Sequence, residues 1–194
     1  IQNNTAAGAS ADQGGGGVFN AGGTVMINGN TMITGNTATG ALGSGGGILN
    51  DAGGSLTVQN ATISGNTAVR AGGGIEDNSG AGTTFTLTNV TLDGNTTMSS
   101  PGNGGGVHIT GPGNMNITGG VVSNNTASAE GGGLWNGTGT MTIADVMIQN
   151  NTAAGAMSDQ GGGGVFNAGG TVMISGSTMI TGNTATGAAG SGGG

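Results

Sequence analysis

The sequence has no cysteine and no lysine, and Arg70 is its only basic residue. Without cysteine, the chain can form neither a disulfide framework nor a thiolate metal site. A net charge of −7 with one arginine argues against binding to nucleic acid or to an anionic membrane surface, because both need basic groups. No apolar run approaches the roughly 18 residues of a membrane-spanning helix, so we expect no membrane insertion.

Proline is also scarce, with two residues, whereas glycine fills 50 of 194 positions. The absence of a strict three-residue glycine period excludes collagen. Disorder is the usual alternative for a glycine-rich chain, but apolar residues recur here at fixed places, which a disordered linker does not need. The sequence begins at Ile1 without an initiator methionine or a signal peptide, so we interpret it as a mature fragment or a window of a longer chain.

Two levels of repeat organise the chain. Residues 1–47 and 148–194 match at an offset of 147 and differ at five of 47 positions. A shorter repeat of 27–32 residues begins at each run of three glycines, at Gly15, Gly45, Gly72, Gly104, Gly131, Gly162 and Gly192. We therefore predict one continuous domain, residues 1–194, in which a unit of five coils (1–147) is followed by a repeat of its first 47 residues.

Each short repeat contains three pieces that resemble strands. An apolar residue follows the glycines, a second piece alternates as in Leu56-Thr57-Val58, and a third ends in the pattern apolar-x-x-Asn. Alternation with a period of two in short runs indicates strands, and no segment has a helical period. The first and third pieces predict two columns of core residues: Val18, Ile48, Ile75, Val107, Leu134 and Val165, and Ile33, Ile63, Leu92, Val122, Ile148 and Ile180.

A repeat of about 30 residues cannot bury its apolar face alone, but stacked repeats can. We therefore predict an all-β parallel β-helix (a β-solenoid) with three strands per coil, in which each strand pairs with its equivalent one coil away. Right-handed crossovers are the rule for parallel strands, so we expect a right-handed solenoid. Length varies mainly at one corner, in segments such as 37–44 and 96–103.

An asparagine ends the third piece of every coil. Stacked asparagines can bond along a column because the amide is both donor and acceptor, so we expect a structural ladder. A ligand site built from these residues is the alternative. The predicted ladder comprises Asn4, Asn36, Asn66, Asn95, Asn125, Asn151 and Asn183.

These two motifs, seen in Gly45-Gly46-Gly47-Ile48 and Ile63-Ser64-Gly65-Asn66, resemble the β-helix repeats of large bacterial secreted and surface proteins. The polymorphic outer-membrane proteins, with Gly-Gly-Ala-Ile and Phe-x-x-Asn repeats, are similar. Glycine replaces alanine here, and isoleucine replaces phenylalanine. The resemblance covers every coil and implies a right-handed parallel β-helix at the cell surface or outside the cell. It implies no particular activity.

Residues able to do chemistry are few. Many pectin-cleaving enzymes share this fold and use basic or paired acidic groups, but Arg70 is expected to be a solvated loop residue. Glu76 and Asp77 are adjacent on a strand, so they should point to opposite faces and make a poor acid/base pair. His108 is expected on the surface. We predict no enzyme and no cofactor, with a weak calcium site at Asp77 and neighbouring carbonyls as the alternative.

An outward stripe is the most distinctive surface feature predicted. Phe19, Leu49, Trp135 and Phe166 share one position in successive coils, interrupted by Glu76 and His108. This stripe either packs under the corner loops or makes lateral contact with another solenoid or a ligand.

The long repeat, the few catalytic groups and the lack of an evident capping element at either end favour a structural role. We expect a building block of an extracellular fibre or giant cell-surface protein, with coils stacked end to end between copies or continued in the same chain. A surface adhesin, similar to autotransporter passengers, that binds glycans or host surfaces is the alternative. A polysaccharide-active enzyme and an ice-binding protein fit the residues less well.

Overall fold

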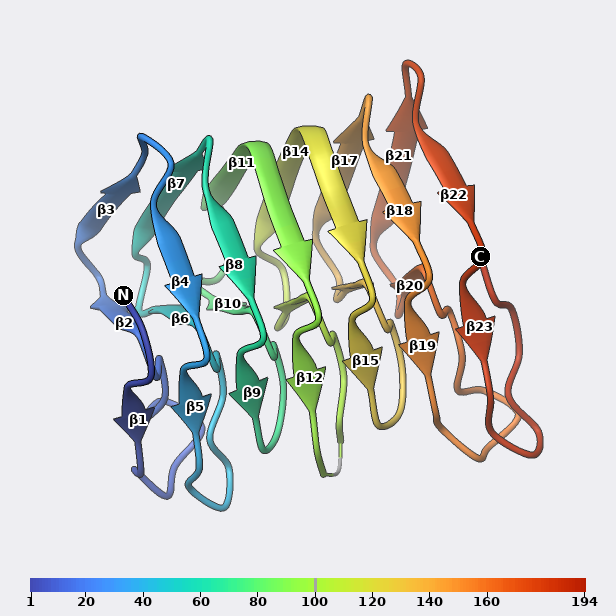
Figure 1. Ribbon diagram of the computed structural model, residues 1–194, viewed down its shortest axis with the longest axis horizontal. Helices are drawn as coiled ribbons and strands as arrows, with labels where there is room; N and C mark the ends of the chain where they lie inside the picture. Colours follow the sequence, from blue (N-terminus) through green and yellow to red (C-terminus); the bar gives the residue numbers. More distant parts are fainter. Residues whose placement is uncertain (100) are drawn as a thin grey trace.

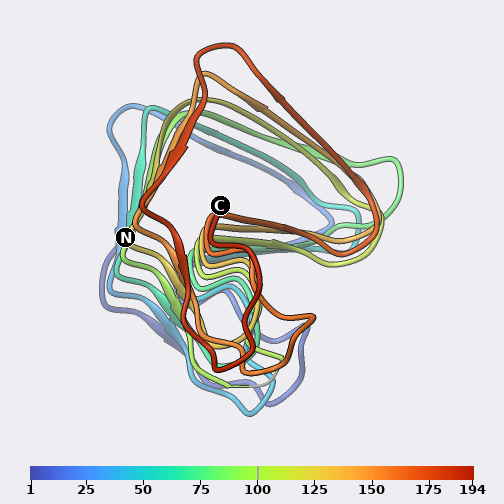
Figure 2. The ribbon, with the colours of Figure 1, turned by 90° about the vertical axis from the view of Figure 1, so that its right-hand side faces the viewer.

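The computed structural model describes residues 1–99 and 101–194, so Ser100, in the predicted corner segment 96–103, lies outside the described residues. Strands are the only regular elements described, and all their pairings are parallel, which confirms the predicted β-solenoid. No described helix is long and apolar enough to cross a membrane. The coils lie side by side along the longest axis (Figure 1) and nearly superimpose in the end view (Figure 2).

Three sheets run along the solenoid. The post-glycine sheet contains the strands that follow the glycine runs: β2 (Val18–Ala21), β6 (Ile48–Asp51), β10 (Ile75–Asn78), β13 (Val107–Ile109), β16 (Leu134–Asn136) and β20 (Val165–Asn167). The Thr-Ala sheet contains seven two-residue strands: β1 (Thr5–Ala6), β5 (Thr37–Ala38), β9 (Thr67–Ala68), β12 (Thr96–Thr97), β15 (Thr126–Ala127), β19 (Thr152–Ala153) and β23 (Thr184–Ala185).

The long sheet carries the second and third pieces of every coil. Its main path contains β3 (Thr24–Ile27), β7 (Ser55–Gln59), β11 (Thr84–Asp93), β14 (Asn114–Ser123), β17 (Thr140–Ala144) and β21 (Thr171–Ser175). Four short strands continue its second half: β4 (Met32–Thr34), β8 (Thr62–Ser64), β18 (Met147–Gln149) and β22 (Met179–Thr181).

The number of sheets agrees with the sequence prediction, but their membership differs. The second and third pieces were expected in separate sheets, yet in β11 and β14 they form one strand. At the tip between them the pairing skips only Asn89, which has a φ of 51°. A single left-handed residue thus turns the chain without ending the sheet. The third sheet instead forms from the Thr-Ala pairs that follow the asparagine ladder.

The core lies between the post-glycine sheet and the two halves of the long sheet. Most residues of the two predicted core columns are fully buried, and Val18, Val165 and Ile180 in the outer coils are partly buried against them. The glycine runs permit close backbone contact between sheets. A Cβ on Gly46 would lie 2.4 Å from the Gly73 carbonyl oxygen and 2.5 Å from the Thr67 backbone, so only glycine fits there.

The corner segments fold back over the strands that they precede. A Cβ on Gly45 would lie 2.8 Å from the Leu49 nitrogen, and one on Gly104 would lie 2.6 Å from the Cβ of His108. In the middle coils the outward face of the post-glycine sheet is therefore covered by the chain's own loops, and Leu49, Glu76 and His108 on that face are buried. Because of this cover, several residues that the sequence predicts to lie on the surface are buried.

Candidate functional site

The seven asparagines that end the third pieces lie in one hydrogen-bonded column, the turn ladder. From Asn36 onward, each Oδ1 accepts both the backbone N–H and the Nδ2 of the asparagine one coil earlier. For Asn66 Oδ1 the two donors belong to Asn36, both at 2.9 Å. Asn66 Nδ2 in turn donates to the Ile33 carbonyl and to Asn95 Oδ1, both at 2.9 Å. With both its amide atoms engaged and the residue buried, this asparagine presents nothing to a ligand.

A second asparagine column, which the sequence reading missed, runs through the post-glycine sheet. Asn20 Nδ2 donates to Asn50 Oδ1 at 2.7 Å, and Asn50 Nδ2 donates to Asp77 Oδ1 at 2.6 Å. Ile109 occupies the next position, and after it Asn136 Nδ2 donates to Asn167 Oδ1 at 2.9 Å. We call this the post-glycine ladder. Its sequence signal is an asparagine two residues after the apolar residue, which two of the six coils lack.

Ile109 interrupts the post-glycine ladder, and this break leaves Asn136 without one hydrogen-bond partner in the described part of the chain. Its Oδ1 is buried and has no hydrogen-bond partner among the described residues, because Ile109 offers no amide. On the other side of the break, Asp77 can accept the bond from Asn50 but, when ionised, can donate none onward. The post-glycine ladder is therefore two separate chains of hydrogen bonds.

The predicted outward stripe does not form an open lateral face. Leu49 is completely buried and Trp135 is half-buried, whereas Phe19 in the first coil is 48 % exposed. Trp135 stacks on Phe166 with ring centroids 6.2 Å apart, and its Nε1 donates to Glu130 Oε2 of the corner segment at 2.9 Å. The stripe packs beneath the corner segments, so lateral contact through Leu49 is excluded.

The prediction that Arg70 and His108 are solvated was wrong, because both contact Glu76 under the corner loops. Glu76 is completely buried and His108 is 4 % exposed. Arg70 Nη2 lies 2.9 Å from Glu76 Oε1, and Arg70 Nε donates to Ser44 Oγ at 2.7 Å. His108 Nδ1 lies 2.8 Å from Glu76 Oε2. We call Arg70, Glu76 and His108 the charged cluster.

Burial by itself would raise the pKa of Glu76, but the nearby His108 and Arg70 and the Thr110 hydroxyl outweigh it, so the pKa is lowered. Thr110 Oγ1 donates to Glu76 Oε1 and lies 3.1 Å from His108 Nδ1, the same nitrogen that faces Glu76. A nucleophilic triad needs the hydroxyl and the carboxylate on opposite ring nitrogens. The arrangement stabilises a buried carboxylate and is not suited to activating the Thr110 hydroxyl.

Asp77 points away from this cluster, as the alternation of the strand predicts. Burial raises its pKa to about 6, opposed by hydrogen bonds from Asn50 and Ser79 and assisted by the charge of Glu76. Asp77 Oδ1 accepts from Asn50, and its Oδ2 accepts from Ser79 Oγ at 2.9 Å. Among the described residues no three His, Cys, Asp or Glu side chains gather to hold a metal ion. The predicted calcium site at Asp77 thus has one carboxylate already engaged by protein donors.

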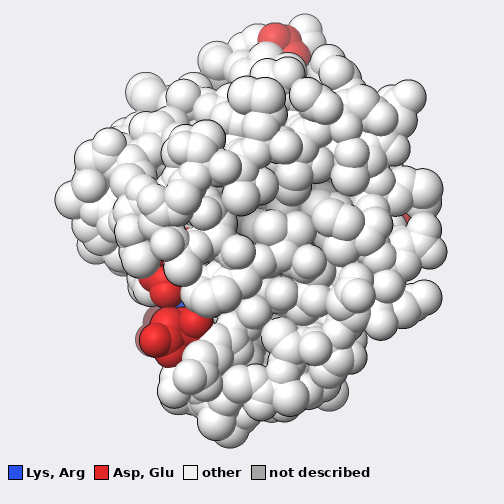
Figure 3. All heavy atoms as spheres, turned by 90° about the vertical axis from the view of Figure 1, so that its left-hand side faces the viewer, with Lys and Arg blue, Asp and Glu red and all other residues white. Residues whose placement is uncertain are grey.

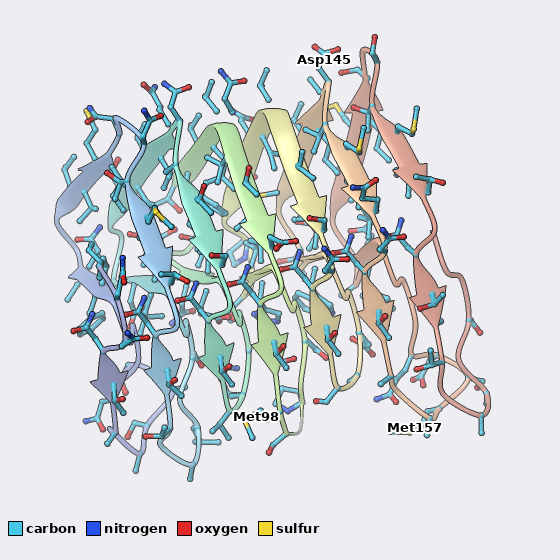
Figure 4. The ribbon with its side chains drawn as sticks, in the orientation of Figure 1. Met98, Asp145 and Met157 are labelled. Carbon is cyan, nitrogen blue, oxygen red and sulfur yellow. The ribbon has the colours of Figure 1, made fainter. Side chains whose placement is uncertain are left out.

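Hollows lined by described residues mark the outer surface. One, of about 420 Å³, crosses three coils beside the tips of the long sheet and is lined by Asn30, Met32, Asn60, Ala61, Thr62, Asn89 and Thr91. Another, of about 350 Å³, lies between corner segments that carry Met98 and Met157, both on the lower loops in Figure 4. The first hollow is lined by amides and hydroxyls without a charged group, and we call it the tip groove.

No family model matches this chain, and no curated protein or solved structure matches it. The resemblance of its motifs to bacterial surface repeats therefore stays a prediction.

Proposed function

We propose that this chain is a structural segment of an extracellular β-solenoid fibre or giant repetitive cell-surface protein, in which coils stack end to end. The observation that carries the proposal is the set of positions at which the near-identical segments 1–47 and 148–194 differ. All five differences fall outside the core and both ladders, at Ser10/Met157, Ala11/Ser158, Asn28/Ser175, Asn30/Ser177 and Leu42/Ala189. The core and ladder residues that join one coil to the next are therefore the same in both segments.

The edges of the sheets support further stacking. In the Thr-Ala sheet, Thr5 pairs with Thr37 near one end and Thr152 pairs with Thr184 near the other. The same residue types thus meet at both ends, and an added coil would find the same partners. The end view in Figure 3 shows few charged side chains on the N-terminal face, so little repulsion opposes stacking there.

The test is to add a second complete 147-residue unit to the chain and measure both proteins by small-angle scattering. Five more coils at about 4.8 Å each should lengthen the rod by about 24 Å with the same cross-section. Electron microscopy of any filaments should give about one coil per 4.8 Å from their mass per length. A wider particle, or two rods joined flexibly, would contradict the proposal.

A second candidate function, glycan binding by a surface adhesin, is favoured by the tip groove. Its asparagines recur once per coil, and a linear glycan lying along the solenoid would meet one amide about every 4.8 Å. Amides and threonine hydroxyls can bond sugar hydroxyls, and Met32 offers an apolar contact. The groove, and not the covered Trp135 stripe, is the surface to test.

Replacing Asn60 and Asn89 by glycine removes both amides and preserves their left-handed turns, where φ is 50° and 51°. The matched control replaces Asn124 and Asn150, which have the same conformation (φ 55°) at another corner. If short β-linked glucose or N-acetylglucosamine oligomers bind, calorimetry should show about tenfold weaker binding for the first variant alone. No binding to the parent chain, or an equal loss in both variants, would rule out the groove.

A further inference from the structure

A chain of oxygen atoms, buried at Asp77 and Ser79 and partly exposed at Thr83 and Gly80, leads from Asp77 into the turn after β10. Asp77 Oδ2 lies 2.9 Å from Ser79 Oγ, which lies 2.6 Å from Thr83 Oγ1, which lies 2.5 Å from the Gly80 carbonyl oxygen. Asp77 is completely buried and Ser79 is 8 % exposed. Each of these three contacts is short enough to hold a hydrogen bond.

With Asp77 ionised, the two hydroxyl groups provide too few protons to form a hydrogen bond at each of the three oxygen–oxygen contacts. Ser79 and Thr83 supply two hydroxyl protons for three oxygen–oxygen contacts, and the carboxylate and the carbonyl can only accept. If Ser79 donates to Asp77 and Thr83 to Gly80, the 2.6 Å contact between the two hydroxyls holds no proton. One further proton, on Asp77 Oδ2, would complete the series: Asp77 to Ser79, Ser79 to Thr83, and Thr83 to Gly80.

We propose that Asp77, Ser79 and Thr83 form a proton-binding site that stabilises the solenoid in mildly acidic solution. The surroundings favour the neutral carboxylic acid. On β6 the facing group is the neutral Asn50, with Asp51 beside it, and on β13 it is the apolar Ile109. Glu76 adds negative charge from the other face of β10, where Arg70 and His108 bind it. No cation is bonded to Asp77 among the described residues.

The direction of the pH effect follows from the Asp77 pKa of about 6, which lies above the ordinary value of 3.8 for this carboxyl group. A pKa raised by folding gives stability that is present in acid and is lost as the pH rises through the folded value. The equilibrium constant for unfolding should therefore be about tenfold larger at pH 7 than at pH 5. The lowered pKa of Glu76 acts in the opposite direction, but only below about pH 4.5.

The experiment is urea unfolding between pH 5 and pH 7, followed by fluorescence of Trp135, the only tryptophan. Asp77→Asn has the same shape and retains the bond with Asn50, and subtraction of its profile removes the contribution of all other titratable groups. The tenfold change should disappear in Asp77→Asn and become smaller in Thr83→Val, which lacks the second hydroxyl. An identical pH dependence in the parent chain and Asp77→Asn would overturn the proposal.

Infrared spectroscopy of the folded parent chain provides a test that needs no stable variant. The C=O stretch of a buried carboxylic acid should appear between pH 7 and pH 5. If all carboxyl groups are still ionised at pH 5, the site does not bind a proton in this range and the proposal fails.

Discussion

The two asparagine ladders of this solenoid are built from the same amide, yet one is continuous and the other is broken. In the turn ladder each Oδ1 after the first coil accepts a backbone N–H as well as a side-chain amide, as Asn125 Oδ1 does from Asn95. A buried backbone N–H needs a partner, so every coil requires asparagine there. In the post-glycine ladder the described bonds between coils all start from side-chain amides, which donate to the next side chain or, as from Asn20 Nδ2 to the Ser55 carbonyl, to the backbone. No described backbone N–H depends on an amide of the next coil there, and Asp77 and Ile109 are tolerated.

The break coincides with the other irregular feature of the molecule. Asp77 and Ile109 lie on β10 and β13, the two strands that also carry Glu76 and His108. One face of this strand pair interrupts the post-glycine ladder and the other face interrupts the covered apolar stripe. Among the described strands of the post-glycine sheet, this pair therefore interrupts both patterns at once.

The largest effect is expected from breaking the turn ladder. Asn95→Leu removes four hydrogen bonds of 2.9–3.0 Å and leaves the buried Asn66 N–H without its acceptor. We expect a loss of about 3–5 kcal/mol in the free energy of unfolding, measured in urea. Asn136→Leu in the broken ladder is the matched control and should cost about 1–2 kcal/mol, because its Oδ1 has no partner to lose. Equal losses would mean that the backbone bond is not what separates the ladders.

The next effect concerns the charged cluster on the other face of β10. Glu76→Leu should cost about 3 kcal/mol, because it leaves Arg70 without its buried counter-ion and removes the carboxylate oxygen that lies 2.8 Å from His108 Nδ1. The triple variant that combines Arg70→Met, Glu76→Leu and His108→Leu should recover most of that loss, because no buried charge is then left unpaired. Urea unfolding measures both variants. If the triple variant is no more stable than Glu76→Leu, the cost comes from packing and not from unpaired charge.

The sequence predicts the regular part of this molecule well. Glycine spacing and alternation predict the coils, and the parallel solenoid is confirmed because each coil can bury its apolar residues only against the next. The membership of the sheets was wrong, since alternation does not reveal that one left-handed residue such as Asn89 leaves a sheet intact.

The charged cluster could not be predicted, for a different reason. Alternation states which face of a strand a side chain occupies, but not whether a loop covers that face. His108 and Leu49 point outward from the core and are nevertheless buried, because the glycine corners fold over them. The post-glycine ladder was missed because Asp77 and Ile109 replace its asparagine in two successive coils, so the asparagines do not recur in every coil.

A smaller effect is expected from repairing the broken ladder. Asp77→Asn supplies a donor towards position 109, and Ile109→Asn supplies both an acceptor for it and a donor for Asn136 Oδ1. The two substitutions should therefore be favourably coupled at pH 7, by about 1–2 kcal/mol in a double-mutant cycle. Additive effects would show that amides at these two positions do not meet.

The smallest effect is expected at an asparagine outside both ladders. Asn89 is exposed at a tip with a φ of 51°, and Gly119 occupies the equivalent tip one coil later with a φ of 65°. Asn89→Gly should change the free energy of unfolding by less than about 0.5 kcal/mol. Asn89→Ala should cost about 1 kcal/mol more, because alanine resists a positive φ. Urea unfolding of the two variants beside the parent chain measures both differences.

These two variants isolate what an asparagine contributes when no ladder surrounds it. At Asn89 the backbone conformation is the main requirement, and its amide makes only a 3.4 Å contact with Asn60 Oδ1. In the turn ladder the conformation is ordinary and the amide is the requirement. If Asn89→Gly were as damaging as Asn95→Leu, exposed amide rows would stabilise the stack as strongly as buried ones. Burial of the backbone hydrogen bond would then not explain why one ladder is continuous and the other is broken.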